Sequence, residues 1–306
     1  MSLDHYEARS LEIYRVPLLF VMPPTSKAYV FDLLPGQSFF EFLLEAGYDI
    51  YVMDWSNPGM HEKHLDLEHY VTKFIDRCAS IVRERSGEKD ISIAGYCMGG
   101  VLSVIYAALN PQAPIRNLIC FTTPFDWSEW GLFNKLSDPA YFNVDQMVDV
   151  LGIIPADLIS SSLEMLRPAS KIATPIQVWD NMWNDEFVRS NRALERWAGD
   201  ALSVPGEYFR DIIKELMFKN SLFTGSLVMG GRTVRVEEVR ASFLHAVAKH
   251  DHIVPEAVSQ ELVKHIGSED KQEIVVKGGH VSVVAGANAI QRLWPQIDQW
   301  LGERSV

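Results

Sequence analysis

Short runs of apolar and β-branched residues alternate with amphipathic segments up to about residue 124 and again from about residue 236. The apolar runs are continuous, which is typical of strands that are buried on both faces of a parallel sheet. Between them, apolar positions recur at helical spacing, and one such segment stops at Gly87, a residue type that favours helix C-caps. This alternation predicts an α/β fold with a mostly parallel sheet. We expect strands at residues 16–22, 48–54, 90–95, 116–122, 242–248 and 272–277.

The pattern changes between residues 125 and 235. Trp, Met, Phe and Pro are mixed into helix-like pieces there, and no strand pattern is clear. A mainly helical insertion that folds over one edge of a sheet would have this form. We therefore expect residues 1–124 and 236–306 to form one α/β core, with residues 125–235 as a helical cap, or lid. The alternative is a separate helical domain.

Composition is that of an ordinary globular chain, with 47% hydrophobic residues among 306. The longest apolar runs are far shorter than the ~20 residues of a membrane-spanning helix, and the charged N-terminus has no apolar centre, so we expect neither a span nor a signal peptide. A formal charge of −12 does not support nucleic-acid binding, which needs concentrated Lys and Arg. Three widely spaced cysteines argue against a disulfide framework and a zinc site, and are typical of a reducing cytoplasm.

One cysteine stands in the sequence "GYCMGG", directly after the third expected strand and before a helical segment. A strand, then Gly-x-nucleophile-x-Gly, then a helix is the arrangement of a nucleophile elbow. The tight turn leaves no room for side chains two residues before and after the nucleophile, and Gly95 and Gly99 have none. The helix start would direct its free N–H groups, that of Met98 first, toward a thiolate and an oxyanion at Cys97. The alternative is a buried core cysteine before a glycine turn, and we expect Cys120 to be such a core residue.

An elbow of this kind predicts a carboxylate and then a histidine later in the chain, each after a strand. Asp251 follows the fifth expected strand and His280 follows the sixth. Because parallel strands end at the same sheet edge, both side chains should lie near Cys97. His250 and His252 flank Asp251 and are rival bases, but a residue next to the carboxylate in sequence is poorly placed to be oriented by it. We therefore predict Cys97 as the nucleophile, His280 as the base and Asp251 as the orienting carboxylate.

Several segments together resemble the catalytic domain of polyhydroxyalkanoate (PHA) synthases, especially the shorter two-component classes and their archaeal relatives. The resemblance covers most of residues 16–303 and rests on "VPLLFVMPPTSKAYVFDL", "GYDIYVMDWSNPG", "GYCMGG", "KHDHIVP" and "KGGHVSVVAG", in that order. It implies an α/β-hydrolase fold with a helical cap, and an acyltransferase that polymerises (R)-3-hydroxyacyl-CoA into a polyester with release of CoA. The family's catalytic set would fall on Cys97, Asp251 and His280, and further substrate-binding positions on His252, Trp197 and Tyr208.

The resemblance also implies the setting: no metal and no organic cofactor, a cytoplasmic location at the surface of polyester granules, and, as partners, an accessory synthase subunit and a second copy of the chain in a homodimer. A cysteine suits this chemistry, because acyl transfer from CoA to a thiolate exchanges one thioester for another and keeps the acyl group activated. Two alternatives stay open. One is a cysteine hydrolase on the same fold, such as a PHA depolymerase, esterase or thioesterase. The other is a catalytically silent partner subunit.

Overall fold

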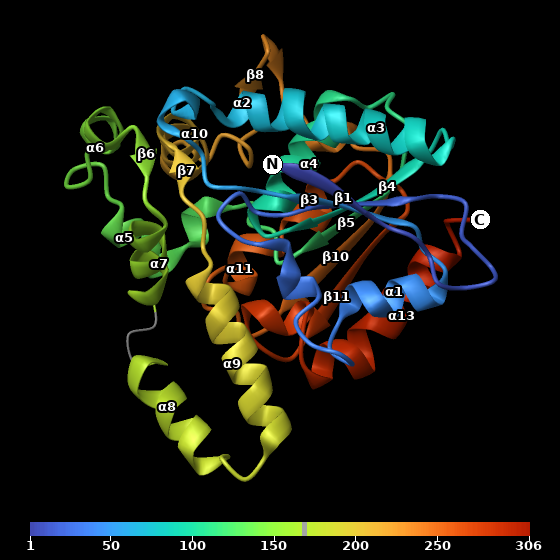
Figure 1. Ribbon diagram of the computed structural model, residues 1–306. Helices are drawn as coiled ribbons and strands as arrows, with labels where there is room; N and C mark the ends of the chain where they lie inside the picture. The colour runs from blue at the N-terminus through green and yellow to red at the C-terminus, as the bar shows by residue number, and fades with distance from the viewer. Residues whose placement is uncertain (167–169) are drawn as a thin grey trace.

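The computed structural model describes residues 1–166 and 170–306, and its main sheet has seven strands in the order β1-β3-β2-β4-β5-β10-β11 (Figure 1). Neighbouring strands are parallel except β1, which pairs antiparallel with β3. The predicted α/β fold with a mostly parallel sheet is confirmed, and all six expected strands are present. The strands are β1 (Ser2–Tyr6), β2 (Leu18–Val21), β3 (Ile50–Asp54), β4 (Ile91–Tyr96), β5 (Ile115–Phe121), β10 (Ser242–Ala248) and β11 (Lys271–Val276).

Within the main sheet, the hydrophobic pattern did not predict β1, which lies at one edge. Its sequence, SLDHY, is largely polar and mostly exposed, so it lacks the continuous apolar run of the inner strands. Backbone pairing with β3 holds it in place, and the His5 ring stacks on Tyr51 with the ring centroids 4.2 Å apart. His5 Nε2 also lies 2.8 Å from Asp49 Oδ1. These contacts depend on the folded sheet and leave no local pattern in the sequence.

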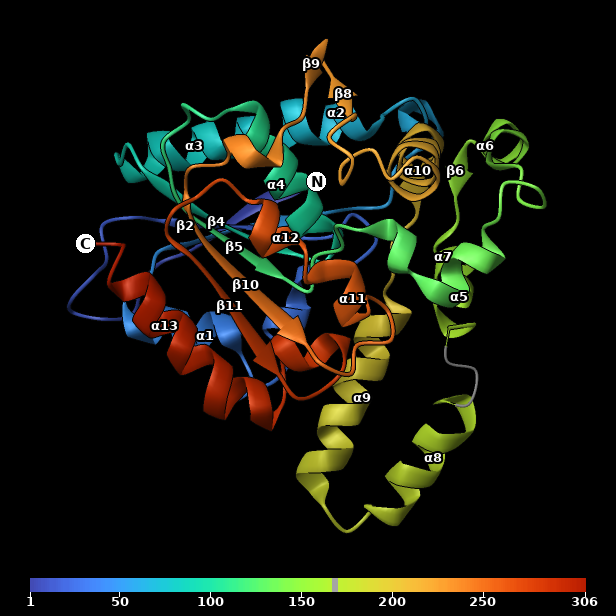
Figure 2. The same ribbon diagram turned by 180° about the vertical axis from the view of Figure 1, so that it is seen from behind.

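Helices cover both faces of the sheet, with α2, α3 and α4 on one face and α1 and α13 on the other (Figures 1 and 2). The N-cap of α1 is Ser38, whose side chain accepts a backbone N–H of the first turn, and its C-cap is Gly47, with a φ of 103°. Residues 67–86 form one continuous helix that stops at Gly87, with a φ of 72°, as expected. The helices outside residues 125–235 include α1 (Phe39–Ala46), α2 (Leu67–His69), α3 (Asp76–Ser86), α4 (Met98–Leu109), α11 (Glu256–Ser259), α12 (Leu262–His265) and α13 (Trp294–Gly302).

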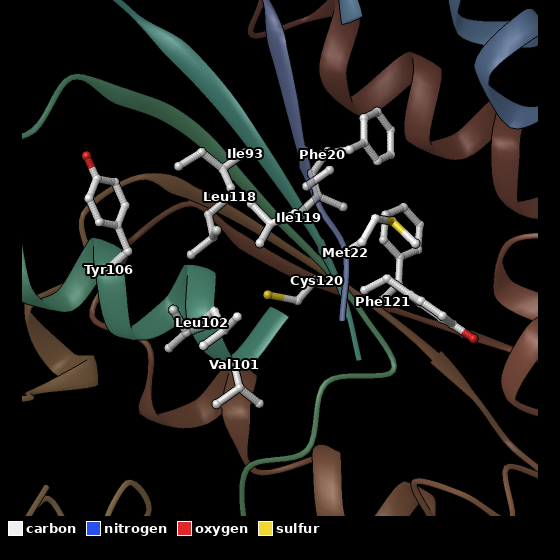
Figure 3. Packing of buried hydrophobic residues seen from close by; sticks show 14 of the residues in the cluster. Phe20, Met22, Ile93, Val101, Leu102, Tyr106, Leu118, Ile119, Cys120 and Phe121 are labelled. Carbon is white, nitrogen blue, oxygen red and sulfur yellow. The ribbon is translucent and has the colours of Figure 1, made fainter. Parts of the chain in front are cut away.

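The hydrophobic core lies between the sheet and the helices, and it fixes the position of α4. Every residue of β2 and β4 is buried, as strands covered on both faces require. α4 is buried along nearly its whole length, and its Leu102 belongs to the same cluster of buried apolar side chains as Cys120 of β5 (Figure 3). The expectation that Cys120 is a core residue is therefore confirmed. The start of α4 is thus held firmly at the carboxyl edge of the sheet.

Residues 127–218 are mainly helical where the structure describes them. Two pairs of two-residue strands follow residue 152, and neither pair joins the main sheet. α8 and α9 form a hairpin that extends away from the sheet, while α9 also contacts residues 28–31 of the core (Figures 1 and 2). The elements between residues 125 and 235 include α5 (Gly131–Leu136), α6 (Val144–Leu151), β6 (Ile153–Ile154), α7 (Ala156–Glu164), α8 (Ser170–Asp180), α9 (Asp185–Gly199), β7 (Val204–Pro205), α10 (Gly206–Asp211), β8 (Val228–Met229) and β9 (Arg232–Thr233).

Candidate active site

Cys97 lies at a sharp turn between β4 and α4. Its φ of 51° and ψ of −119° fall outside the regions that residues other than glycine normally adopt, so the backbone is strained here. Neighbouring chain segments approach the turn closely. A Cβ atom at Gly95 would collide with Gly100, and one at Gly99 would collide with the backbone of Val21 in β2. The glycines therefore permit the close crossing of β2, β4 and α4 that holds Cys97 at the sheet edge.

The three cysteine thiols differ in their surroundings. Cys97 is partly exposed and lines a cavity of about 190 Å³, whereas Cys78 and Cys120 are buried in the core. Burial raises the pKa of Cys78 to about 11 and the pKa of Cys120 to about 12, so both remain protonated near neutral pH. Cys97 is thus the thiol that a ligand in the cavity can reach.

The structure brings His280 and Asp251 together beside Cys97. Asp251 follows β10 and His280 follows β11, and His280 Nδ1 lies 2.7 Å from Asp251 Oδ2, with both side chains buried. The other carboxylate oxygen of Asp251 accepts the backbone N–H groups of Ile253 and Val254, at 2.8 and 2.9 Å. Asp251 therefore cannot turn away from the imidazole. With Nδ1 bound to Asp251, the second ring nitrogen of His280 is available to Cys97, which lines the same cavity.

Opposing effects act on the pKa of the His280 imidazole. Burial disfavours the imidazolium and lowers the pKa, while the charges of Asp251 and then Cys97, and hydrogen bonds to both, raise it. The contributions of Asp251 and Cys97 together outweigh that of burial, so the pKa of His280 lies above its usual range. A raised pKa makes His280 an effective proton acceptor and stabilises an imidazolium next to a thiolate.

Aromatic and aliphatic side chains form most of the cavity wall around Cys97. Trp127 and Trp130, just after β5, lie there with their ring centroids 4.6 Å apart. A second, apolar cavity of about 280 Å³ adjoins the first on the side of α5, α6 and α7. The side chains that line both cavities are Phe133, Ile159, Leu163, Phe209 and Ile213. The two cavities thus share part of their walls, and both are largely apolar.

The other residues singled out in the sequence have different positions. Met98 opens α4 and lines the cavity. Trp197 and Tyr208 line it as well, and the Trp197 indole N–H donates to the Lys27 carbonyl oxygen at 2.9 Å. His252 is exposed and is not among the residues that line the cavity. The structure therefore brings Trp197 and Tyr208, but not His252, to the cavity of Cys97.

Sequence reasoning missed Trp127 and Trp130 as wall residues. They follow β5 at the carboxyl edge of the sheet, and Trp127 is almost fully buried. Their position directly after a parallel strand was a usable signal, because the ends of such strands surround the site in open α/β sheets. That signal applies to apolar residues after strands as much as to polar ones such as Asp251 and His280.

The described part of the chain contains neither a group of side chains that could hold a metal ion nor a helix that could span a membrane. There, no group of three or more His, Cys, Asp and Glu side chains is arranged to hold a metal ion. Within the same residues, no helix combines the length and the apolar character needed to cross a bilayer.

The fold and the site geometry define a class of protein, and the sequence of residues 32–287 matches the alpha/beta hydrolase fold family. Among solved structures, a soluble variant of monoglyceride lipase from Saccharomyces cerevisiae superimposes with a TM-score of 0.65 at 13% identity, covering 99% of this chain and 92% of that chain. A likeness at this identity concerns the fold alone. The predicted α/β-hydrolase fold is confirmed.

Two relatives place the chain more closely. It is 32% identical over 307 residues to poly(3-hydroxyalkanoate) polymerase subunit PhaC of Haloferax mediterranei, covering 100% of this chain and 62% of that protein. It is 32% identical over 295 residues to the subunit of the same name from Allochromatium vinosum, covering 96% of this chain and 82% of that protein. The chain belongs to the poly(3-hydroxyalkanoate) polymerase family, which confirms the resemblance seen in its motifs. It spans less than two thirds of the length of the Haloferax relative.

Proposed function

We propose that this chain is a PHA synthase-type acyltransferase, which joins (R)-3-hydroxyacyl units from CoA thioesters into a polyester through an acyl group bound to Cys97. One observation supports this above the others. In a chain of the polymerase family, a cysteine occupies the strained turn before α4, beside a buried His280–Asp251 pair. A thiolate there forms a thioester, which keeps the acyl group reactive toward an alcohol.

The first half-reaction charges Cys97. His280 takes the thiol proton, and the thiolate attacks the thioester carbonyl carbon of the acyl-CoA. The N–H of Met98, at the positive end of α4, faces the resulting oxyanion. The bond to the CoA sulfur then breaks, and CoA leaves with the proton from His280. One thioester is exchanged for another, so the acyl group stays activated.

The second half-reaction forms the ester bond. The 3-hydroxyl of one acyl unit gives its proton to His280 and attacks the thioester carbonyl carbon of the other. The carbon–sulfur bond to Cys97 breaks, and the sulfur recovers a proton from His280. Asp251 holds the imidazole in one tautomer and stabilises the imidazolium in both half-reactions.

Residues 125–235 act as a cap over the core formed by residues 1–124 and 236–306. The support for this division is that the helical segment supplies Trp197 and Tyr208 to a cavity whose nucleophile belongs to the core. An apolar enclosure lowers the amount of water at the thioester. The cap would thus favour transfer to a hydroxyl over hydrolysis.

The cap surface also suits contact with an apolar partner. Large apolar side chains are exposed along it, including Tyr141 (90%), Trp179 (73%) and Trp183 (80%). Trp179 and Trp183 lie four residues apart around the end of α8, and exposed apolar side chains grouped in this way are typical of interaction sites. The partner that binds this surface would be the polyester granule or an accessory synthase subunit.

Joint measurement of CoA release and polymer tests the proposed function. The purified chain is incubated with (R)-3-hydroxybutyryl-CoA, and CoA, free acid and polyester are quantified together. We expect CoA to appear with polymer, and neither to appear with Cys97→Ala. Free acid equal to the released CoA would indicate a hydrolase instead. Absence of CoA release, with alkylation of Cys97 unaffected by substrate, would indicate a catalytically silent subunit.

A further inference from the structure

Two hydrogen-bond donors in the wall of the Cys97 cavity have no partner. The hydroxyl of Tyr208 and the indole N–H of Trp127 are buried, and neither has an acceptor among the described residues. The side chains are 3% and 1% exposed, and both residues line the cavity together with Cys97 and His280. Burial of a donor without an acceptor is unfavourable, so such groups are uncommon in folded proteins and call for an explanation.

Other indoles in the wall of the same cavity do have acceptors. Trp130 and Trp197 line the same cavity, but the Trp130 N–H donates to the Ile253 carbonyl oxygen at 2.6 Å and the Trp197 N–H to the Lys27 carbonyl oxygen at 2.9 Å. Two of the indoles in this wall thus have acceptors, whereas the indole of Trp127 has none among the described residues.

The position of Trp127 is tightly fixed. It is the first residue of a one-turn helix, Trp127–Glu129, that follows β5. Its backbone N–H donates to Asn220 Oδ1 at 3.0 Å. Asn220 in turn donates to Asp126 Oδ1 at 2.7 Å, and its own backbone has a φ of 50°. The Trp127 ring packs edge-to-face against Trp130. The indole therefore cannot easily move to find an acceptor elsewhere.

Tyr208 is held as firmly, and close to the nucleophile. It lies in α10, and its ring centroid is 4.4 Å from that of Tyr70. Burial, and then the charges of Tyr70 and Cys97, raise the pKa of Tyr208 well above its usual value. The hydroxyl thus stays protonated and able to donate, and it lines the same cavity as Cys97.

We propose that the Tyr208 hydroxyl and the Trp127 indole N–H bind the oxygen on C3 of the acyl group attached to Cys97, and so select 3-hydroxyacyl over plain acyl substrates. This inference rests on the proposed function. The carbonyl oxygen of the thioester has its own donors at the start of α4, whereas the C3 oxygen lies further along the acyl chain and needs others. An indole N–H only donates, and both a C3 hydroxyl and the C3 ester oxygen of a growing chain can accept.

The test compares charging of Cys97 by (R)-3-hydroxybutyryl-CoA and by butyryl-CoA, which differ only in the hydroxyl on C3. CoA released in the first turnover is followed by rapid mixing for the parent chain, Tyr208→Phe and Trp127→Phe. We expect the parent chain to prefer the hydroxyacyl substrate, and each variant to lose roughly tenfold to a hundredfold of its charging rate constant with that substrate. The rate constant for butyryl-CoA should change by less than about twofold, because its acyl group has no oxygen on C3.

Two variants serve as matched controls. Trp130→Phe removes an indole N–H that already has an acceptor, and Tyr70→Phe removes a hydroxyl from a ring that packs on Tyr208 without lining the cavity. Both should keep the preference for the hydroxyacyl substrate. If Tyr208→Phe and Trp127→Phe lowered the charging rate constant equally for the two substrates, or lowered it for neither, this inference would be overturned. The proposed function would not be affected by that result. A parent chain that released no CoA from either substrate would overturn the proposed function together with this inference.

Discussion

At the scale of single residues, the partners of each polar group limit what it can do. Asp251 accepts two backbone N–H groups with one oxygen and the His280 imidazole with the other. The imidazole is therefore fixed in orientation and tautomer, and its second nitrogen is left for Cys97. A buried carboxylate with this set of partners also supports a positive charge on His280.

Replacement of Asp251 by Asn should separate the two half-reactions. The amide would present a donor where His280 Nδ1–H needs an acceptor, so we expect turnover to fall roughly a hundredfold to ten-thousandfold. Charging needs only a thiolate, which the start of α4 also stabilises, and should be impaired less than ester formation. Mass spectrometry of Asp251→Asn should therefore detect acylated Cys97 without polymer. An equal loss of both steps, or a greater loss in His252→Ala, would contradict this division of roles.

The same substitution should change how His280 titrates. Asp251 makes the largest contribution that raises the pKa of His280, whereas burial lowers it. We expect the pKa of His280 to be lower in Asp251→Asn than in the parent chain, as measured by NMR of the imidazole nitrogens. A raised pKa stabilises the folded state below the ordinary imidazole pKa of 6.5 and ceases to do so as the pH rises through the folded-state value. The loss of unfolding free energy in Asp251→Asn should therefore be larger at pH 6 than at high pH, and an equal loss at both would contradict this.

The cysteines offer a second test at this scale. Cys97→Ala should abolish CoA release with little effect on stability, because Cys97 is partly exposed at the cavity. Cys120→Ala should keep CoA release while lowering the free energy of unfolding by about 1–2 kcal/mol, because Cys120 is fully buried in β5. Urea denaturation and CoA release, measured on the same preparations, check both. An active Cys97→Ala together with an inactive Cys120→Ala would refute the choice of nucleophile.

Sequence order sufficed to indicate that Asp251 and His280 would lie near Cys97, because the ends of parallel strands meet at one edge. Sequence order could not indicate that the donors of Trp127 and Tyr208 are buried without acceptors. Whether a buried donor lacks an acceptor depends on atoms from several segments of the folded chain. The sequence does not distinguish a tryptophan whose N–H has an acceptor from one whose N–H has none.

At the scale of elements, the junction of β4 and α4 depends on close backbone approach. Gly99 lies against the backbone of β2, so Gly99→Ala should force α4 and β2 apart and lower the free energy of unfolding by about 3 kcal/mol or more. Gly199→Ala, at the end of α9 with open space around it, should change the free energy of unfolding by less than about 1 kcal/mol. Thermal unfolding of the two variants is the measurement. A Gly99→Ala chain as stable as the parent would show that the crossing is not tight.

Prediction of the strands succeeded where the sequence contains a run of apolar and β-branched residues, even in the partly exposed β11, and failed where it contains none. β2 and β4 are buried at every position, and their apolar runs were visible in the sequence. β1 is mostly exposed, and β6 to β9 have only two residues each, too few for a periodic pattern. Contacts made after folding define these short strands, and the local sequence does not.

At the scale of the whole molecule, the cavity brings Cys97, at the end of β4, together with Tyr208 of α10, which lies more than one hundred residues later in the sequence. The adjoining cavity is largely apolar and shares wall residues with the first on α5, α7, α10 and the segment after α10. A cavity of this kind is made by side chains from many segments, so the sequence indicated a helical cap but neither the cavity nor its walls. Its effect on the reaction can be measured through the fate of the acyl group.

Ile159→Ser should let water compete for the acyl group on Cys97. Ile159 lines both cavities, and a smaller polar side chain there would open the apolar wall and offer water a hydrogen-bond partner. We expect the ratio of free 3-hydroxybutyrate to polymer to rise roughly several-fold, while CoA release in the first turnover changes little, because charging itself uses no water. Leu132→Ser is the matched control, since Leu132 lies on α5, is 49% exposed and lines neither cavity. An unchanged ratio in Ile159→Ser, or the same rise in Leu132→Ser, would show that the apolar wall does not protect the acyl group from water.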